Sequence, residues 1–134
     1  MGLVSLMPIR QLRLVVTTAD YDEAVRFYRD VLGMTEQDAV QPPTGRVMVL
    51  DAGRATLEIA EPVSAEYIDS VEVGRRVSPS IRLALEVDTA ETTAKALGAQ
   101  GVEVLGEPRP TPFLSTNARI NAPAGLQLTL FHMD

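Results

Sequence analysis

The first sixty residues alternate between strand-like and helix-like patterns of hydrophobic positions. Residues 10–18 alternate loosely and are rich in Leu and Val, which predicts a strand. Asp20 and Glu23 have the spacing of a capping box, and the apolar positions that follow recur with helical periodicity up to Gly33. Gly53 then marks a hairpin. We therefore expect one helix over 20–33 and further strands over 34–40, 46–50 and 55–61.

The same order of patterns recurs in the second half of the chain. Residues 81–87 predict a strand, and Asp88 or Thr89 caps a helix that ends near Gly101. Residues 107–115 hold three prolines and are expected to form a loop. The remaining strands are predicted over 102–105, 117–121 and 126–131.

The chain thus contains two βαβββ modules in a single domain over residues 1–134. The first module spans 9–62, the second spans 81–134, and 63–80 is expected to be a linker in which 65–71 could form a helical turn or two. The opening strands correspond at Arg13 and Arg82, and the hairpin glycines at Gly53 and Gly125. A repeated unit that cannot close its own core pairs with its copy. This predicts an α+β fold in which a curved, cup-shaped mixed sheet has its helices on the outside and a ligand pocket inside.

Composition and charge exclude several kinds of site and partner. The 134 residues include no Cys and one His, His132, so thiolate chemistry and multi-imidazole metal sites are excluded. The 12 cationic and 18 anionic residues give a net charge of −6, which argues against nucleic acid and anionic membranes as partners. The first eight residues lack the basic start and cleavage site of a signal peptide, so we expect a cytoplasmic protein.

Four segments together resemble one known family. They are FYRDVLG at 27–33, GRATLEIAE at 53–61, LEVD at 85–88 and PAGLQL at 123–128. Their order, spacing and duplication are similar to those of the glyoxalase/bleomycin-resistance/dioxygenase superfamily, also called the vicinal oxygen chelate fold. The resemblance covers nearly the whole chain. It implies a concave sheet face on which many members hold a divalent metal through His and Glu side chains.

The positions that correspond to the family's metal ligands are Arg13, Glu58, Arg82 and Thr129. Arginine has no lone pair to offer a metal and stays charged, and one carboxylate with one hydroxyl is a poor ligand set for Zn²⁺, Ni²⁺ or Fe²⁺. His132 lies three residues past Thr129, so strand alternation points it to the opposite face. We therefore expect neither a metal nor another cofactor, as in the drug-sequestering members of the family.

If the resemblance holds, these four side chains converge on the floor of the cup. Arg13 and Arg82 would then clamp a carboxylate, phosphate or enolate through bidentate hydrogen bonds. The competing interpretation is that Arg13, Glu58 and Arg82 form a network that merely fills the former metal site.

The sequence also predicts where several residues outside these four positions lie. We expect Met48 and Leu50 on the inner face of the sheet, and Tyr21, Phe27, Tyr28 and Val31 between helix and sheet. The apolar stretch 111–114 is either a lid at the rim of the cup or part of a dimer interface. Arg75 and Arg76 are either a solvated pair or a gate.

Three functions remain open at this stage. The first is a metal-independent protein that binds a small molecule with an anionic or carbonyl-rich group, such as a sequestered drug or metabolite. The second is a lyase or isomerase of the same superfamily that acts next to a carbonyl with Glu58 as general base. The third is a dimeric interaction module with a filled cup. The resemblance also implies a homodimer.

Overall fold

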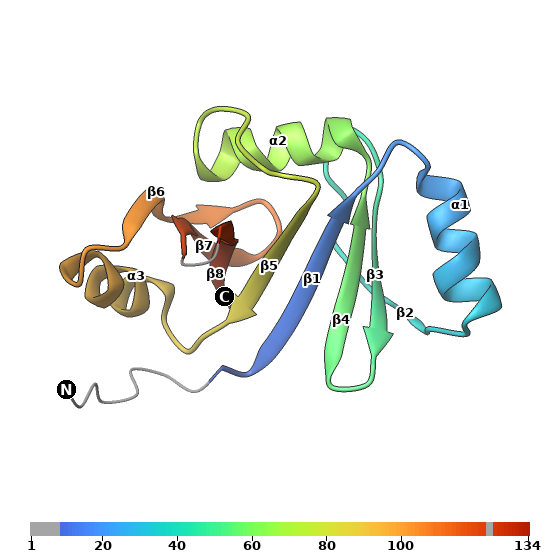
Figure 1. Cartoon of the computed structure of the whole chain (residues 1–134), viewed down its shortest axis with the longest axis horizontal. Helices are drawn as coiled ribbons and strands as arrows, with labels where there is room; N and C mark the ends of the chain where they lie inside the picture. The colour runs from blue at the N-terminus through green and yellow to red at the C-terminus, as the bar shows by residue number, and fades with distance from the viewer. Residues whose placement is uncertain (1–8, 123–124) are drawn as a thin grey trace.

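The protein forms one curved sheet of eight strands flanked by helices (Figure 1). The computed structural model describes residues 9–122 and 125–134. The strand order is β2-β3-β4-β1-β5-β8-β7-β6. The bounds of the strands are β1 Gln11–Thr17, β2 Glu36–Gln37, β3 Val47–Ala52, β4 Ala55–Ala60, β5 Ile81–Glu86, β6 Glu103–Thr111, β7 Ser115–Asn121 and β8 Gln127–Met133. The predicted α+β fold and its mixed sheet are confirmed.

The two halves of the sheet join within the chain through their opening strands. β1 runs antiparallel to β5, with Arg13 opposite Ala84. Each opening strand also lies parallel to the last strand of its own half, so that Arg13 is opposite Thr56 and Ala84 is opposite Thr129. This repeated arrangement places equivalent positions of the two halves on the same face of the sheet.

The helix of the first half packs on the convex face. Helix α1, Tyr21–Val25, continues as the wider turn η1, Arg26–Val31, in which the Leu32 N–H donates to Phe27 O at 2.9 Å. Tyr21 and Val25 pack against Leu50, Leu57 and Ile59.

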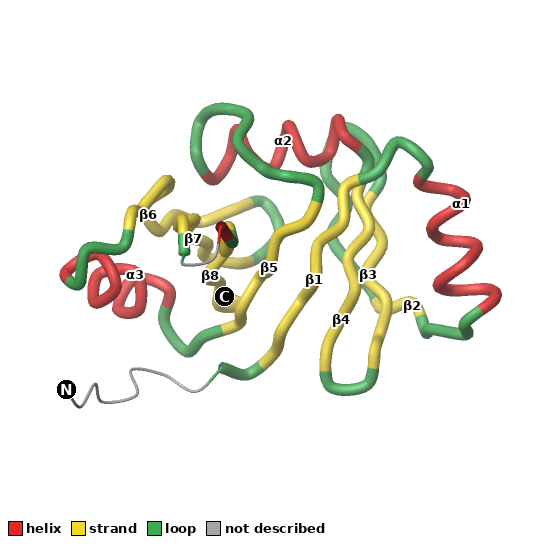
Figure 2. The backbone as a smooth tube through the Cα atoms, in the orientation of Figure 1, coloured by secondary structure: helices red, strands yellow, loops and turns green. Residues whose placement is uncertain are grey.

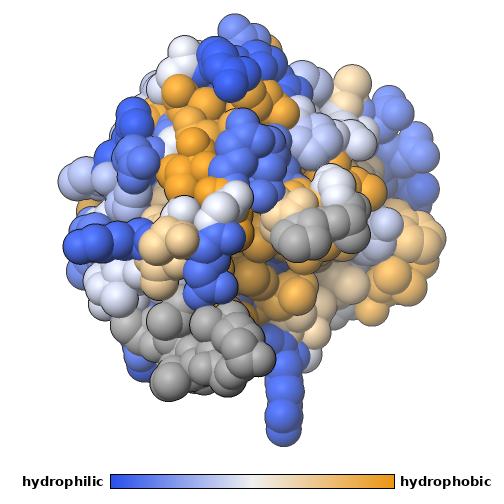
Figure 3. Space-filling model, turned by 60° about the vertical axis from the view of Figure 1, so that its left-hand side comes forward, coloured by the Kyte–Doolittle hydropathy of each residue, from blue (hydrophilic) through white to orange (hydrophobic). Residues whose placement is uncertain are grey.

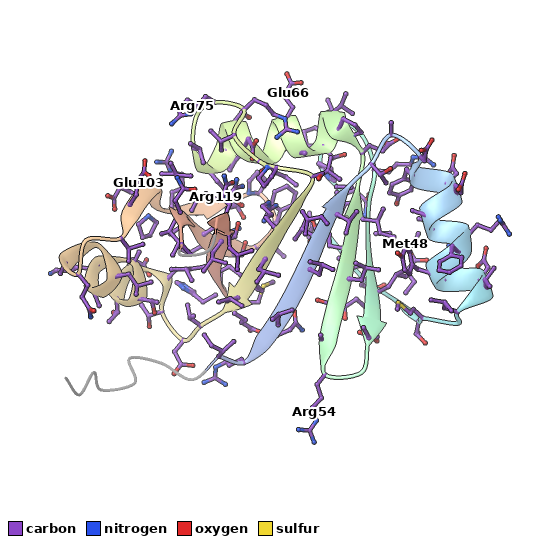
Figure 4. All side chains as sticks on the ribbon, viewed as in Figure 1. Met48, Arg54, Glu66, Arg75, Glu103 and Arg119 are labelled. Atoms are coloured by element: carbon purple, nitrogen blue, oxygen red, sulfur yellow. The ribbon has the colours of Figure 1, made fainter. Side chains whose placement is uncertain are left out.

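This packing corrects two predictions. Leu50 is buried in the cluster beneath α1 and Met48 packs against it, so both lie on the convex side, as Figure 4 shows for Met48. The inward positions of β3 are Val47 and Val49, because alternation is offset by one residue. Phe27 and Val31 are largely exposed rather than core, since the wider turn carries them away from the sheet.

The helix of the second half, α3 (Ala90–Ala99), covers the same convex side. Ala94 packs against Ala118, Ile120 and Leu130. Thr89 precedes the helix but forms no side-chain cap. Instead the Ala90 N–H donates to His132 Nδ1 at 2.9 Å, which places His132 on the face opposite to Thr129, as predicted.

The predicted linker contains an eleven-residue helix, α2, Pro62–Glu72. Proline is tolerated in the first turn, where its missing N–H would be unsatisfied in any case. Ile68 of α2 packs against Val47, Val49 and Ala60, which are inward-facing positions of the first half. The helix therefore lies across one end of the concave face rather than outside the cup (Figures 1 and 2).

Two further segments differ from the expectation. β6 runs on to Thr111, where a loop was predicted, because β6 is an edge strand with register shifts that tolerates Pro108 and Pro110. β2 covers only two residues of the predicted 34–40 strand. The first eight residues and Pro123-Ala124 of the closing turn lie outside the described residues.

Apolar side chains also reach the surface. On the face shown in Figure 3, hydrophobic patches lie between hydrophilic side chains. Leu114 and Met133 are 64% and 55% exposed. Among the helices of the described residues, none is long and apolar enough to cross a membrane.

Candidate functional site

A cavity of about 370 Å³ opens on the concave face of the sheet. All four residues predicted for the site, Arg13, Glu58, Arg82 and Thr129, line it. Inward positions of β1, β3, β5, β7 and β8 supply the other walls, together with α2 and the turn between β6 and β7. Lining residues from these segments include Gln11, Val15, Val47, Val49, Ile68, Glu72, Ala84, Phe113, Leu114, Asn117 and Phe131.

The Arg13 guanidinium is hydrogen-bonded to three neighbouring side chains. Its Nε donates to Thr56 Oγ1 at 3.1 Å, its Nη1 to Glu58 Oε1 at 3.2 Å and its Nη2 to Gln11 Oε1 at 3.2 Å. The guanidinium also lies 5.5 Å from the ring centre of Phe131. All three nitrogens of Arg13 therefore already have a partner within the protein, and its charge is balanced by Glu58.

Arg82, at the equivalent position of the second half, lies in a different environment. It is 7% exposed, and its Nη1 donates to Thr129 Oγ1 at 2.8 Å. Within residues 9–122 and 125–134 its guanidinium forms no ion pair. Burial, together with the charge of nearby Arg119, lowers the pKa of Arg82 from its ordinary value. The cavity wall thus contains a buried cation that lacks a bonded anion.

A third arginine, Arg119 of β7, was missed by the sequence analysis. Its side chain is fully buried, and Arg119 is not among the residues that line the cavity. Its Nη2 donates to Glu72 Oε1 at 2.8 Å and its Nη1 to Asp69 Oδ1 at 2.9 Å. Thr129 Oγ1 donates to the same oxygen of Glu72 at 3.2 Å, and Asn117 Nδ2 donates to Glu72 Oε2 at 2.7 Å. Both carboxylate oxygens of Glu72 therefore accept hydrogen bonds, and Arg119 balances the negative charge of Glu72 where it lines the cavity.

Asp69 ties this cluster to the loop that follows α2. Its carboxylate accepts hydrogen bonds from the Val77 and Ser78 N–H groups, from Ser78 Oγ and from Arg76 Nη1. Burial by itself would raise the pKa of Asp69, but these hydrogen bonds and that from Arg119 outweigh it and lower the pKa to about 2. The carboxylate is therefore ionised whenever the fold is intact near neutral pH.

Two features of the sequence pointed to this cluster. Asp69 and Glu72 have the i, i+3 spacing that places two side chains on one face of a helix. Ser115, Asn117 and Arg119 alternate along β7 in the same manner as Arg82 and Ala84 along β5. The helix was predicted only as a turn or two, so the partners of Arg119 could not be recognised.

The rim of the cavity is apolar on one side. Phe113 and Leu114 lie in the turn between β6 and β7 and line the cavity. This agrees with the prediction that the segment lies at the rim of the cup. Phe113 also packs edge-on against Tyr67 of α2. Arg75 and Arg76 are not among the lining residues, and Figure 4 shows Arg75 pointing away from the fold. Arg76 instead bonds Asp69 and Ser78 O, so these two residues are not a gate.

The residues on the cup floor do not fit a divalent metal. Within the described ranges, no group of three or more His, Cys, Asp or Glu side chains lies close enough to hold an ion. Two of the four family ligand positions carry guanidinium groups, and the carboxylate of Glu58 already bonds one of them. A cation placed there would be repelled by both arginines.

The chain was compared with known families, curated proteins and solved structures. The profile of the Glyoxalase/Bleomycin resistance protein/Dioxygenase superfamily matches residues 10–130. No significant match was found among curated proteins.

Several solved structures share the fold. A hypothetical protein of Bacillus halodurans superposes with a TM-score of 0.71 at 16% identity, over 97% of this chain and 96% of its own. Methylmalonyl-CoA epimerase of Mycobacterium tuberculosis gives 0.68 at 24% identity, over 100% and 93%. A variant of the Streptomyces coelicolor methylmalonyl-CoA epimerase with bound 2-nitronate-propionyl-CoA gives 0.66 at 23%, over 96% and 99%. With the profile match over nearly the whole chain, the protein belongs to the Glyoxalase/Bleomycin resistance protein/Dioxygenase superfamily.

Proposed function

We propose that this protein binds a small organic molecule with an anionic or carbonyl-rich group in its cup, without a metal ion. The observation that carries the proposal is Arg82. A buried charge is costly unless it is paired and hydrogen-bonded, and among the described residues Arg82 has only the hydroxyl of Thr129 as a partner. A ligand carboxylate or phosphate would supply the missing partner.

The balance of nearby charges also favours an anion. The buried carboxylates Asp69 and Glu72 are paired with Arg76 and Arg119, Glu58 is paired with Arg13, and Arg82 is the fourth guanidinium group of this region. One positive charge is therefore left over on this side of the cup. Charge-assisted hydrogen bonds are stronger than neutral ones, particularly away from water.

The same residues support metal-independent binding. Arg13 and Arg82 occupy two of the positions at which other members of the family hold metal ligands, and the carboxylate of Glu58 is hydrogen-bonded to Arg13. The cavity of about 370 Å³ lies within the usual range for small-molecule sites. This open volume favours a binding protein over an interaction module whose cup is filled.

The second candidate is an isomerase that acts next to a carbonyl with Glu58 as base. Glu58 Oε1 accepts from Arg13, whereas Oε2 forms no hydrogen bond within the described part of the chain. A free carboxylate oxygen in a cavity wall is a suitable position for a general base. The similarity in fold to methylmalonyl-CoA epimerases also supports the isomerase as a candidate function.

The decisive experiment is a ligand screen on EDTA-treated protein, read by thermal shift and then by calorimetry. Binding to the folded state raises the melting temperature. We expect carboxylates or phosphates to stabilise the protein, and Zn²⁺ or Ni²⁺ to leave their affinity unchanged. Arg82→Gln should weaken binding at least tenfold.

Arg54→Gln is the matched control for that variant, because Arg54 points away from the sheet at the tip of the β3–β4 hairpin (Figure 4). Equal binding by the two variants, or binding that requires added metal, would contradict the proposal. For a ligand with an exchangeable proton next to its carbonyl, NMR in D₂O detects proton exchange. Exchange in the wild type that is lost in Glu58→Gln, with binding retained, would favour the isomerase.

The family resemblance also leads us to propose a homodimer in the cytoplasm. Size-exclusion chromatography with light scattering tests the oligomeric state directly. The turn at 111–114 remains a candidate for that interface as well as for a lid.

A further inference from the structure

We infer that the ligand is an amphipathic carboxylate, with its head group at Arg82 and its apolar chain directed toward Leu114 and Met133. This inference rests on the proposed function, because it assumes that an anion binds at Arg82. It adds the orientation of the ligand and the chemical nature of its other end.

The charges of the cavity define two different ends. The Arg82 guanidinium bonds Thr129, near the start of β8 and close to Glu72 of α2. Glu86 also lines the cavity, but it lies four residues further along β5, about 13 Å away. A carboxylate head group is therefore attracted to the Arg82 end and repelled from the Glu86 end.

The end remote from Arg82 has an apolar rim. Leu114 and Met133 line the cavity there, and they are nevertheless 64% and 55% exposed. Phe113 also lines the cavity but lies toward α2, because it packs against Tyr67 and the cluster of Val47, Ala60 and Ile68. A ligand chain that covered Leu114 and Met133 would remove apolar surface from water. Met133 lies four residues beyond Thr129 along β8, about 13 Å, so the chain must be extended to reach it.

Leu114 is held in an unfavourable backbone conformation at this rim. Its φ of 62° lies in the left-handed region, where a side chain other than glycine or asparagine is uncommon. Thr111 Oγ1 and Ser115 Oγ bond across the turn at 2.9 Å, and the Asp134 N–H donates to Leu114 O at 3.0 Å. These contacts maintain a strained turn whose leucine is exposed and faces the cavity, and such strain is concentrated at ligand-contacting sites.

The test uses calorimetry with butanoate, hexanoate, octanoate and the alcohol octanol. Affinity should rise about fourfold for each methylene that becomes buried, until the apolar end is filled. Octanol should bind at least tenfold more weakly than octanoate. Leu114→Gly should weaken octanoate about fivefold or more and leave butanoate unchanged.

Leu114→Gly should also fold at least as stably as the wild type, because glycine adopts a positive φ without a Cβ clash. Loss of octanoate binding therefore cannot be ascribed to unfolding. Leu114→Met retains an apolar side chain and is the matched control, which should bind octanoate as the wild type does.

The outcomes separate this inference from the proposed function. If carboxylates bind through Arg82 but their affinity does not rise with chain length, or Leu114→Gly binds octanoate normally, the inference is wrong and the proposed function stands. If 6-aminohexanoate binds more tightly than hexanoate, Glu86 selects a cationic group and the apolar assignment is also wrong. If no carboxylate of any length binds but a phosphate or another ligand of the screen does, the inference is wrong and the proposed function stands. If none of these ligands binds, both are wrong.

Discussion

Asp69 should make the fold sensitive to acid over a defined range of pH. The pKa of this carboxyl is about 2 in the folded protein, against the ordinary value of 3.8. A group whose pKa is lowered by folding contributes stability above its unfolded pKa and loses it as the pH falls through the folded pKa. Each unit of pKa difference corresponds to about 1.4 kcal/mol, so protonation of Asp69 should cost about 2–3 kcal/mol of unfolding free energy between about pH 4 and pH 2.

The assay is urea unfolding of wild type and Asp69→Asn at pH 7, 4, 3 and 2. At pH 7 the variant should be less stable, because Arg119 loses one of its two buried carboxylates. That deficit should shrink by about 2–3 kcal/mol as the pH falls to 2, since the wild-type carboxyl then becomes neutral too. Asp51→Asn, at an exposed position of β3, is the matched control for the loss of an aspartate outside the buried cluster. A constant deficit for Asp69→Asn would refute the role assigned to this carboxylate.

Other predictions concern packing and capping. Gly106→Ala should destabilise the fold by about 1–3 kcal/mol in urea unfolding, because a Cβ there would lie 2.0 Å from the backbone oxygen of Glu72. The matched change Gly98→Ala, where the new Cβ meets Val104 at an ordinary 3.6 Å, should stabilise α3 by about 0.5–1 kcal/mol. His132→Ala should cost about 1 kcal/mol, because the Ala90 N–H at the start of α3 loses its acceptor. An unchanged unfolding midpoint for His132→Ala would contradict that capping role.

The repeated order of elements could be predicted because it depends on local patterns. The strands at Gln11–Thr17 and Ile81–Glu86 and the helix after Thr89 lie within two residues of their predicted bounds. These features depend on side-chain periodicity, which a short stretch of sequence already contains. The placement of Glu58 and Thr129 on the inner face came from the family resemblance instead, and both residues line the cavity.

The segments that were missed depend on contacts between distant parts of the chain. Helix α2 has a weak apolar stripe of its own, and its position is determined by Ile68 against β3 and by Glu72 against Arg119. β6 continues through two prolines only because it lies at the edge of the sheet. The ion pair between Asp69 and Arg119 could not be identified from sequence, because fifty residues separate the two.

Arg13 and Arg82 occupy equivalent positions of the two modules, but the structure predicts unequal roles in ligand binding. Each nitrogen of Arg13 already donates to Thr56, Glu58 or Gln11, whereas Arg82 donates one hydrogen bond, to Thr129, within the part of the chain that the structure describes. In calorimetric titrations with hexanoate, Arg13→Gln should therefore weaken binding less than about threefold, against at least tenfold for Arg82→Gln.

Glu58→Gln extends the same argument. It removes a negative charge from the cavity and releases Arg13, so it should tighten hexanoate binding. The loss caused by Arg82→Gln should then be smaller in the Glu58→Gln background, because Arg13 can partly replace Arg82. Equal losses for the two arginine variants in the wild-type background would instead indicate a symmetric clamp. In that case the Arg13–Glu58 bond must open when the ligand binds, and Glu58→Gln should leave the ratio of the two losses unchanged.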